Sequence, residues 1–359
     1  MKPFTFEQLP ARIVFAPGAL SSVGDEVERL GVALVMLISD AATASQADAV
    51  ASQLGTRCVL RWDEVAQHVP VELAERAREA ATKFEVDAIV TIGGGSSTGL
   101  AKALALSHKL PIVAVPTTYA GSEQTTIYGL TGGIHKQTGK DPIVQPRVVI
   151  YDPELTVGLP GFVTGPSAFN ALAHSVEALW APGNNPITSA LALEGVRAIA
   201  GSLPTVMASP GDVEARGELQ YGAALSGMAL GATSTGLHHK LCHVLGGRFD
   251  LVHADAHSVV LPHALAFNAP ALPDEMARLA EALGSPGADP AGLLWDLAVA
   301  SNVPTKLSEL SGRDGPLQRD QLPGAAATAA EEITVNPRPV TKHDLLEILE
   351  AAYEGHRPV

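Results

Sequence analysis

The chain has little cysteine, few aromatic residues and no run of basic residues. Its 359 residues include two cysteines, Cys58 and Cys242, in no metal-binding or redox spacing. A disulfide framework is therefore not expected, and a reducing cytoplasm is the expected compartment. The N-terminus has no apolar core of signal-peptide length, and no run of about eighteen apolar residues follows. The lack of such a run means that we expect no membrane partner. Because the formal net charge is −14, we also expect no nucleic-acid partner.

The composition favours parallel sheets flanked by helices, since 46% of residues are hydrophobic but only 4% are aromatic. Short apolar runs alternate with helical patterns in the first 150 residues, and predict strands at 33–39, 57–61, 88–92, 112–115 and 148–151. Beyond residue 160, long Ala- and Leu-rich segments predict helices, with a loop at 307–323. We therefore predict a Rossmann-like α/β dinucleotide-binding domain (1–155) and an all-α substrate and catalytic domain (156–359).

A glycine-rich turn follows the third predicted strand. Residues 86–92 run into Gly93, Gly94, Gly95 and Ser96, and a helical pattern follows. Backbone amides without a neighbouring Cβ, together with the positive end of a helix, can hold a pyrophosphate. A plain turn is the alternative interpretation.

Polar residues also follow two other predicted strands. Thr117, Thr118 and Ser122 come after the strand at 112–115, and Asp40 comes after the strand ending at 39. The carboxyl ends of parallel strands are where such sheets bind ligands, and an acidic residue there can accept bonds from an adenine ribose. The alternatives are an ordinary capped loop and a helix cap.

Histidines concentrate in one segment. Residues 236–268 hold half of the chain's twelve histidines, and an earlier helical stretch, 169–180, adds Asn170 and His174. A spacing of four residues within each helix puts a pair of side chains on one face. A single histidine is usually a packing residue, but this many buried polar nitrogens would be costly in an apolar core. We therefore predict one site formed by His174, His239, His243 and, past an expected helix break at Gly246–Gly247, His253.

These motifs, in this order, resemble the iron-containing alcohol dehydrogenase superfamily and, within it, the maleylacetate reductases. The resemblance covers nearly the whole chain and is carried by GGGSSTGLAK (93–102), PTTYAGSE (116–123), FNALAHSVEALWA (169–181), HHKLCHVLGG (238–247), HADAHSVVLPHALAFNA (253–269) and NPRP (336–339). It implies the two-domain fold of dehydroquinate synthase, a homodimer, and reduction of the C=C bond of maleylacetate, a small dicarboxylate, to 3-oxoadipate during the breakdown of aromatic compounds.

Two departures from the metal-dependent members of this superfamily shape our expectations. Their ligand positions match His174, His239 and His253, but they carry aspartate where this chain has Asn170. Because an amide binds divalent ions more weakly than a carboxylate, we expect no metal and only a vestigial site. They also usually carry aspartate at the position of Gly99. Its loss leaves NADPH possible as cofactor, although Asp40 favours NADH.

The resemblance assigns roles to individual residues. His239 and His253 would face the ketone or a carboxylate, His243 would lie between nicotinamide and substrate, and His174 with Asn170 would complete a polar wall. Further expected contacts are Lys240 and Arg248 with a substrate carboxylate, unless both are solvated surface charges, and Lys140 with the cofactor.

Three other functions are alternatives. A metal-dependent alcohol or polyol dehydrogenase would use the same histidines, and Asn170 argues against it. A lyase resembling dehydroquinate synthase would consume no net NADH. A non-catalytic binding protein would not need both a cofactor turn and a histidine site.

Overall fold

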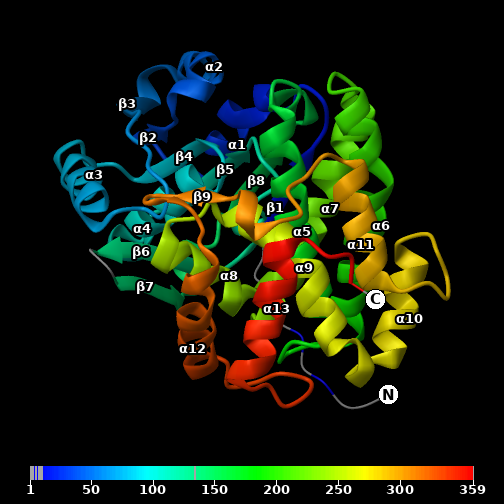
Figure 1. The fold of residues 1–359 in the computed structure, drawn as a ribbon. Helices are drawn as coiled ribbons and strands as arrows, with labels where there is room; N and C mark the ends of the chain where they lie inside the picture. Colours follow the sequence, from blue (N-terminus) through cyan, green and yellow to red (C-terminus); the bar gives the residue numbers. More distant parts are fainter. Residues whose placement is uncertain (1–3, 5, 7–10, 133–134, 359) are drawn as a thin grey trace. The chain divides into compact units, whose positions relative to one another are not determined.

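The computed structural model of the chain describes residues 4, 6, 11–132 and 135–358 (Figure 1). Contacts between residues divide the chain at Leu159–Pro160 into two compact units. We call the described residues 11–159 the α/β unit and residues 160–358 the helical unit.

The α/β unit is built on a parallel sheet of six strands in the order β1-β8-β5-β4-β2-β3. The strands are β1 Arg12–Phe15, β2 Val35–Ile38, β3 Cys58–Trp62, β4 Ala88–Gly93, β5 Ile112–Pro116 and β8 Val148–Tyr151. The inner strands consist of buried apolar residues because helices cover both faces of the sheet. Helices α1 (Val23–Arg29) and α2 (Ala44–Leu54) pack on one face, and α3 (Val71–Lys83) and α4 (Gly95–His108) pack on the other.

The five predicted strands of this sheet are confirmed, whereas two features were not expected. Strand β1 has a mostly exposed pattern and pairs with β8, more than 130 residues away in sequence. Strands β6 (Ile127–Gly132) and β7 (His135–Lys140) form an antiparallel hairpin outside the main sheet. Both depend on partners that local periodicity does not reveal.

The order of the strands creates one switch point. Strand β2 lies between β3 and β4, so the chain leaves β2 toward one edge and returns on its other side. Doubly wound sheets bind ligands at the carboxyl ends of the strands flanking such a point. The segments that start at Asp40 and at Gly94 leave the sheet there.

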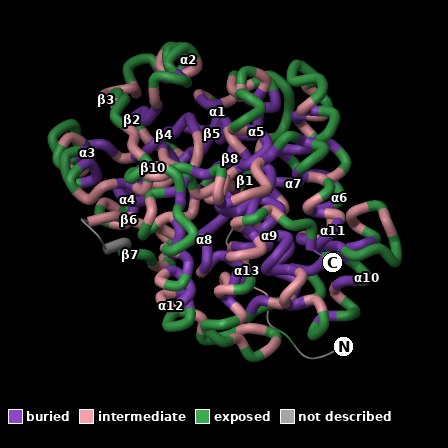
Figure 2. Tube along the Cα trace, viewed as in Figure 1, coloured by how far each residue is buried: buried purple, intermediate pink, exposed green. Residues whose placement is uncertain are grey.

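The helical unit contains the helices α5 Gly161–Ala178, α6 Pro186–Ala208, α7 Val213–Ala232, α8 Leu237–Phe249, α9 His253–Asn268, α10 Pro273–Ala282, α11 Pro290–Ala300, α12 Leu322–Glu332 and α13 Lys342–Glu354, and the short strands β9 Ser311–Gly312 and β10 Gly315–Pro316. Figure 2 shows that α5 and α9 are largely buried. Within the described parts of the chain, no helix is both long and apolar enough to cross a membrane.

The expected helix break at Gly246–Gly247 is wrong, since α8 continues through both glycines. It ends at Phe249, and the next residue, Asp250, has a left-handed φ of 58°. Helix α12, which begins within the loop predicted at 307–323, was also not foreseen.

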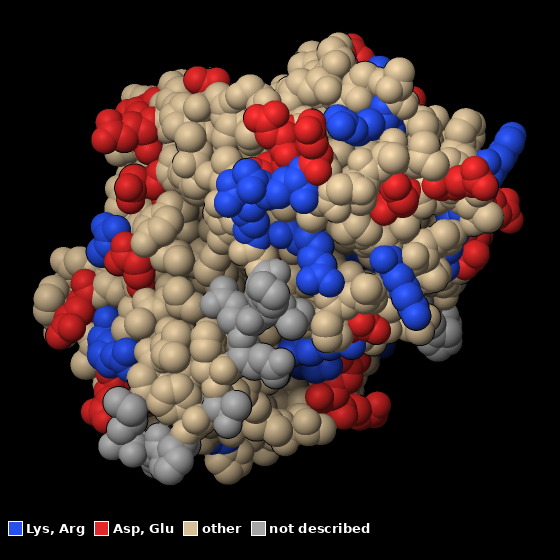
Figure 3. Space-filling view, turned by 180° about the vertical axis from the view of Figure 1, so that it is seen from behind, with Lys and Arg blue, Asp and Glu red and all other residues tan. Residues whose placement is uncertain are grey.

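Charged side chains of both signs lie beside one another on the face shown in Figure 3. Exposed pairs such as Arg61–Asp48 and Arg197–Glu194 are of this kind. Pairs of this type contribute little to stability, and the excess of acidic residues mainly favours solubility.

Candidate functional site

The glycine turn of the α/β unit has no room for side chains. A Cβ on Gly94 would lie 3.0 Å from Thr118 Cγ2, and one on Gly95 would lie 3.3 Å from Ala120 Cβ. Helix α4 begins at this turn without a side-chain cap. Its first N–H groups, together with Ser96 in the first turn, therefore form a cradle that suits a pyrophosphate.

The predicted cofactor residues at the ends of β2, β4 and β5 come together. Thr117 N donates to Gly93 O at 3.0 Å, which joins the two loops. Asp40 caps the turn after β2 by accepting from Thr43 N at 3.1 Å, so the helix-cap interpretation holds for one of its oxygens. Its other oxygen, Oδ2, lies 3.8 Å from the position of a Cβ on Gly93. Asp40 thus both shapes its own loop and borders the glycine turn.

A buried lysine, which the sequence interpretation missed, fixes the loop after β5. Lys102 Nζ donates to Ser122 O (2.7 Å), Thr125 O (2.7 Å), Thr125 Oγ1 (3.0 Å) and Ile127 O (2.8 Å). Burial lowers the pKa of Lys102 to about 7. The predicted cofactor residue Ser122 belongs to this loop, and Lys140 lies at the end of the β6–β7 hairpin, where partial burial lowers its pKa.

Three helices of the helical unit bring the histidines together. Neighbouring rings in this group have centroids 4.2 to 6.5 Å apart. We call these six residues the histidine cluster: His174 on α5, His238, His239 and His243 on α8, and His253 and His257 on α9. The rings of His174 and His239 stack at 5.3 Å, as do those of His243 and His253 at 5.8 Å. The four histidines named from the sequence are therefore neighbours, and buried Asn170 lies one helical turn before His174.

Glu177 connects α5 to the start of α8. Its carboxylate accepts from Gly236 N at 2.9 Å, His238 N at 2.7 Å and His239 Nδ1 at 2.5 Å. Burial alone would raise the pKa of Glu177, but His239 and the other donors lower it to about 2. Sequence reasoning missed this residue, although it follows His174 by three positions and so shares its helix face.

Three histidines of the cluster, His174, His238 and His257, are uncharged at neutral pH. Burial, reinforced by neighbouring histidines, lowers the pKa of His174 and His257 well below the usual value and that of His238 to about 3. A neutral imidazole has one nitrogen that can accept a proton or bind a metal ion. Among the described residues, His174 Nδ1 and His239 Nε2 are buried without a hydrogen-bond partner.

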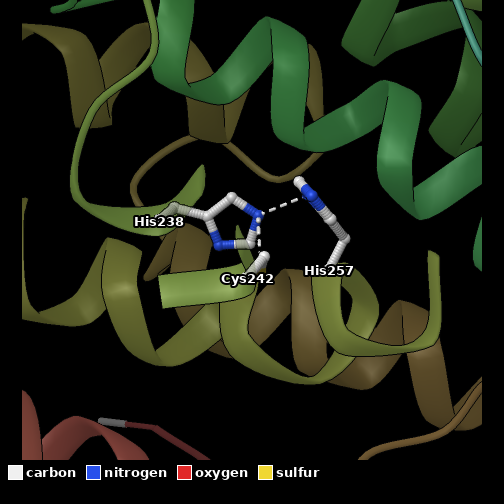
Figure 4. Close-up of side chains that lie close together, drawn as sticks. All are labelled: His238, Cys242 and His257. Carbon is white, nitrogen blue, oxygen red and sulfur yellow. Dashed lines mark hydrogen bonds between the residues drawn. The ribbon is translucent and has the colours of Figure 1, made fainter. Parts of the chain in front are cut away.

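A second group of possible metal-binding atoms combines two histidines of the cluster with Cys242 (Figure 4). His238 Nε2 and His257 Nδ1 share a hydrogen bond of 2.8 Å, and Cys242 Sγ lies 3.8 Å from His238 Nε2. Burial, and then Glu177, raise the pKa of the Cys242 thiol well above its usual value. His238 and His257 were not singled out from the sequence, although the spacing of four between His238 and Cys242 marks one helix face.

The two cations expected to bind a substrate carboxylate contact α12 instead. Lys240 Nζ lies 3.5 Å from Glu332 Oε2, and Arg248 Nη1 donates to Thr328 Oγ1 at 3.1 Å. Neither of these two contacts involves the histidine cluster. Their positions match the surface-charge alternative more closely.

Known proteins match the chain over its whole length. A family model described as iron-containing alcohol dehydrogenase matches residues 10–153, and one for the C-terminal part of that family matches residues 164–353. The chain is 46% identical to a maleylacetate reductase from Burkholderia cepacia, and the match covers 100% of both chains. Two crystal structures also match over 100% of both chains: a putative alcohol dehydrogenase from Ralstonia eutropha (TM-score 0.96, 45% identity) and a maleylacetate reductase from Agrobacterium tumefaciens (TM-score 0.94, 42% identity).

A parallel sheet with a glycine turn, followed by helices that carry a histidine cluster, is thus the architecture of a nicotinamide-dependent oxidoreductase. The chain belongs to the iron-containing alcohol dehydrogenase family. Within that family, curated maleylacetate reductases from Burkholderia cepacia and Cupriavidus pinatubonensis are 46% and 40% identical to it over its full length.

The expectation that no metal binds is wrong. The family is described as iron-containing, and the donor atoms of His238, Cys242 and His257 lie within 4.8 Å of one another. Two of the histidines expected to be metal ligands, His174 and His239, also suit a cation, since each keeps a buried nitrogen without a partner among the described residues. The error was to give Asn170 decisive weight: losing one anionic ligand weakens a site, but the imidazoles that remain are themselves good ligands.

Proposed function

We propose that this enzyme reduces the conjugated C=C bond of maleylacetate to give 3-oxoadipate, with NADH as the hydride donor. The observation that carries the proposal is 46% identity to a maleylacetate reductase over the whole length of both chains. The glycine turn and the histidine cluster support it, because they supply a nucleotide cradle and a group of proton-carrying side chains.

NADH would bind the α/β unit through its pyrophosphate and its adenine ribose. Gly94, Gly95 and Ser96 at the start of α4 would hold the pyrophosphate. Asp40 would accept bonds from the ribose hydroxyls and repel the 2′-phosphate of NADPH. The remaining proposed contacts are Thr117, Thr118, Ser122 and Lys140.

The reaction transfers a hydride and a proton to one double bond. The dihydronicotinamide would give its hydride to the alkene carbon β to the ketone, so the electron pair of the C=C bond moves toward the ketone oxygen as an enolate. Donors aimed at that oxygen lower the barrier, and protonation of the α carbon completes the reduction. A metal ion held by His174, His239 and His253 would supply Lewis-acid polarisation of the same oxygen.

Each residue of the histidine cluster would have its own role in this reaction. His239, which Glu177 fixes by its bond to Nδ1, presents Nε2 for the ketone oxygen or a cation. His253 would face the same group, His243 would be the neighbour of the nicotinamide ring, and His174 with Asn170 would line the pocket. Lys240 and Arg248 would reach a substrate carboxylate only by leaving their α12 partners.

We further propose a cytoplasmic homodimer. Both cysteines are free thiols, which agrees with a reducing compartment. Light scattering of the purified protein would test the assembly, and a monomer at micromolar concentration would contradict it.

The decisive experiment mixes purified protein with maleylacetate and NADH and follows the absorbance of the reduced nicotinamide. We expect oxidation of NADH with one equivalent of 3-oxoadipate formed. A His253→Ala variant should lose roughly a hundredfold in rate, as expected for removal of a group that donates to the reacting atoms. His343→Ala, on an exposed part of α13, is the control and should keep full activity. Failure to consume maleylacetate would refute the function, and full activity of His253→Ala would remove that residue from it.

A further inference from the structure

Cys242, His238 and His257 occupy positions other than those that correspond to the family's metal ligands. His238 and Cys242 are one turn apart on α8, and His257 reaches them from α9. All three side chains are at least 98% buried. Their three donor atoms lie within 4.8 Å of one another, a spacing that fits a single ion.

We propose that His238, Cys242 and His257 form a second cation site that binds a thiophilic divalent ion of the zinc class. In tetrahedral coordination, typical bond lengths place two nitrogen ligands about 3.3 Å apart and a nitrogen and a sulfur about 3.5 Å apart. The separations here are 2.8 Å between His238 Nε2 and His257 Nδ1 and 3.8 Å between His238 Nε2 and Cys242 Sγ. These two separations therefore need to change by about half an ångström or less. The third pair, His257 and Cys242, lies within 4.8 Å and would close by up to about 1.3 Å to reach the tetrahedral N–S separation.

The donor set selects the kind of ion. Two imidazoles and one thiolate are ligands of zinc and similar borderline or soft cations, whereas magnesium and calcium prefer oxygen ligands. Three protein ligands leave the fourth position for water. The family's ligand positions in this chain contain no thiolate, so a sulfur ligand distinguishes the two sites.

Binding at this site changes protons in a defined way. The Cys242 thiol loses its proton to solvent as the sulfur binds the ion. The two imidazoles keep one proton each, on His238 Nδ1 and His257 Nε2, so that Nε2 and Nδ1 face the ion. The resulting charge of +1 is balanced by the Glu177 carboxylate, which accepts from the backbone N of His238. One proton is therefore released for each ion bound.

The outer nitrogens limit the affinity. His238 Nδ1 and His257 Nε2 have no hydrogen-bond partner among the described residues. Tight zinc sites usually hold these atoms with a carboxylate or a carbonyl. We therefore expect weaker binding than at a structural zinc site.

Cobalt(II) titration of the metal-stripped full-length protein tests the proposal, since a cobalt–thiolate bond gives a charge-transfer absorption in the near ultraviolet. We expect this absorption to saturate once one cobalt per chain is bound to the thiolate, in addition to any cobalt held by His174, His239 and His253, and to disappear when zinc is added. C242S should lose it. C58S, which removes the half-buried cysteine of β3, is the matched control and should keep it.

H257Q provides a second arm that leaves both thiols in place. We expect its apparent affinity for cobalt, read from the same absorption, to fall at least tenfold, with an unchanged circular dichroism spectrum. Four results would each overturn the site. They are the absence of cobalt binding, cobalt binding without the thiolate absorption, persistence of the absorption in C242S, and wild-type cobalt affinity in H257Q. None of these readouts depends on turnover of maleylacetate.

Discussion

Replacing Glu177 by glutamine should destabilise the helical unit strongly, although the change removes no volume. One carboxylate oxygen accepts from Gly236 N and His239 Nδ1, and the other accepts from His238 N. A glutamine has one oxygen, so its NH2 group must face at least one of these donors. Hydrogen bonds to charged groups contribute about 1.5–3 kcal/mol each, and a buried donor left without a partner adds a desolvation cost. We therefore expect Glu177→Gln to lower the free energy of unfolding by about 2–4 kcal/mol at pH 7.

Denaturant unfolding followed by tryptophan fluorescence can measure this loss. Two of the chain's three tryptophans, Trp180 and Trp295, belong to the helical unit. A Trp62→Phe background removes the third, which lies in β3, so that the signal reports on the helical unit alone. This separation matters because a chain of two units need not unfold in one step.

An exposed glutamate of the same unit is the control for the loss of charge. Glu194 on α6 pairs with Arg197, and their side chains are 37% and 55% exposed. Glu194→Gln should cost less than about 1 kcal/mol, as is usual for surface ion pairs. Equal losses in the two variants would refute the idea that Glu177 anchors α8.

Three further predictions concern the α/β unit. Burial lowers the pKa of Lys102 to about 7, against about 10.4 in an unfolded chain, so the unfolded state binds more protons between these two pH values. The free energy of unfolding of the wild type relative to Lys102→Met should therefore rise by about 1 kcal/mol per pH unit from pH 7 to 10. A difference that does not change with pH would contradict this. Gly94→Val should weaken NADH binding at least tenfold in fluorescence titrations, because its Cβ would lie 3.0 Å from Thr118 Cγ2. The control Gly158→Val, whose Cβ would have nothing within 4 Å, should bind NADH normally. Similar NADH affinities of the two variants would argue against a cradle at this turn. Asp40→Asn removes the charge that repels a 2′-phosphate and should raise the NADPH to NADH ratio of kcat/KM about tenfold, so an unchanged ratio would exclude Asp40 from cofactor choice.

The sequence was sufficient to predict the secondary structure that surrounds the glycine turn. Buried parallel strands are continuous apolar runs, and the turn follows β4 directly, so both are readable from neighbouring residues. The same holds for α5 and α8, whereas α9 was not among the predicted helices, although its histidines were visible in the sequence. Strand β1 was not readable, because its partner β8 lies at the other end of the unit's sequence.

The metal expectation shows where a single substitution misleads. Asn170 was taken to remove the cation site, yet the imidazoles at the expected ligand positions remain, and a separate group of donors, His238, Cys242 and His257, also lies within 4.8 Å. The proximity of His257 to His238 and Cys242 became visible only when α8 and α9 were packed together.

By itself, the amino-acid sequence determined which faces are apolar, where the chain turns and which residue types share a helix face, because these depend on neighbours within a few positions. Only the tertiary structure decided that Glu177 holds His239, that His257 bonds His238 and that Lys102 ties down the loop after β5. Such contacts depend on how helices and loops pack. A difference of an ångström in that packing separates a hydrogen bond from a mere neighbour, and periodicity carries no information on that scale.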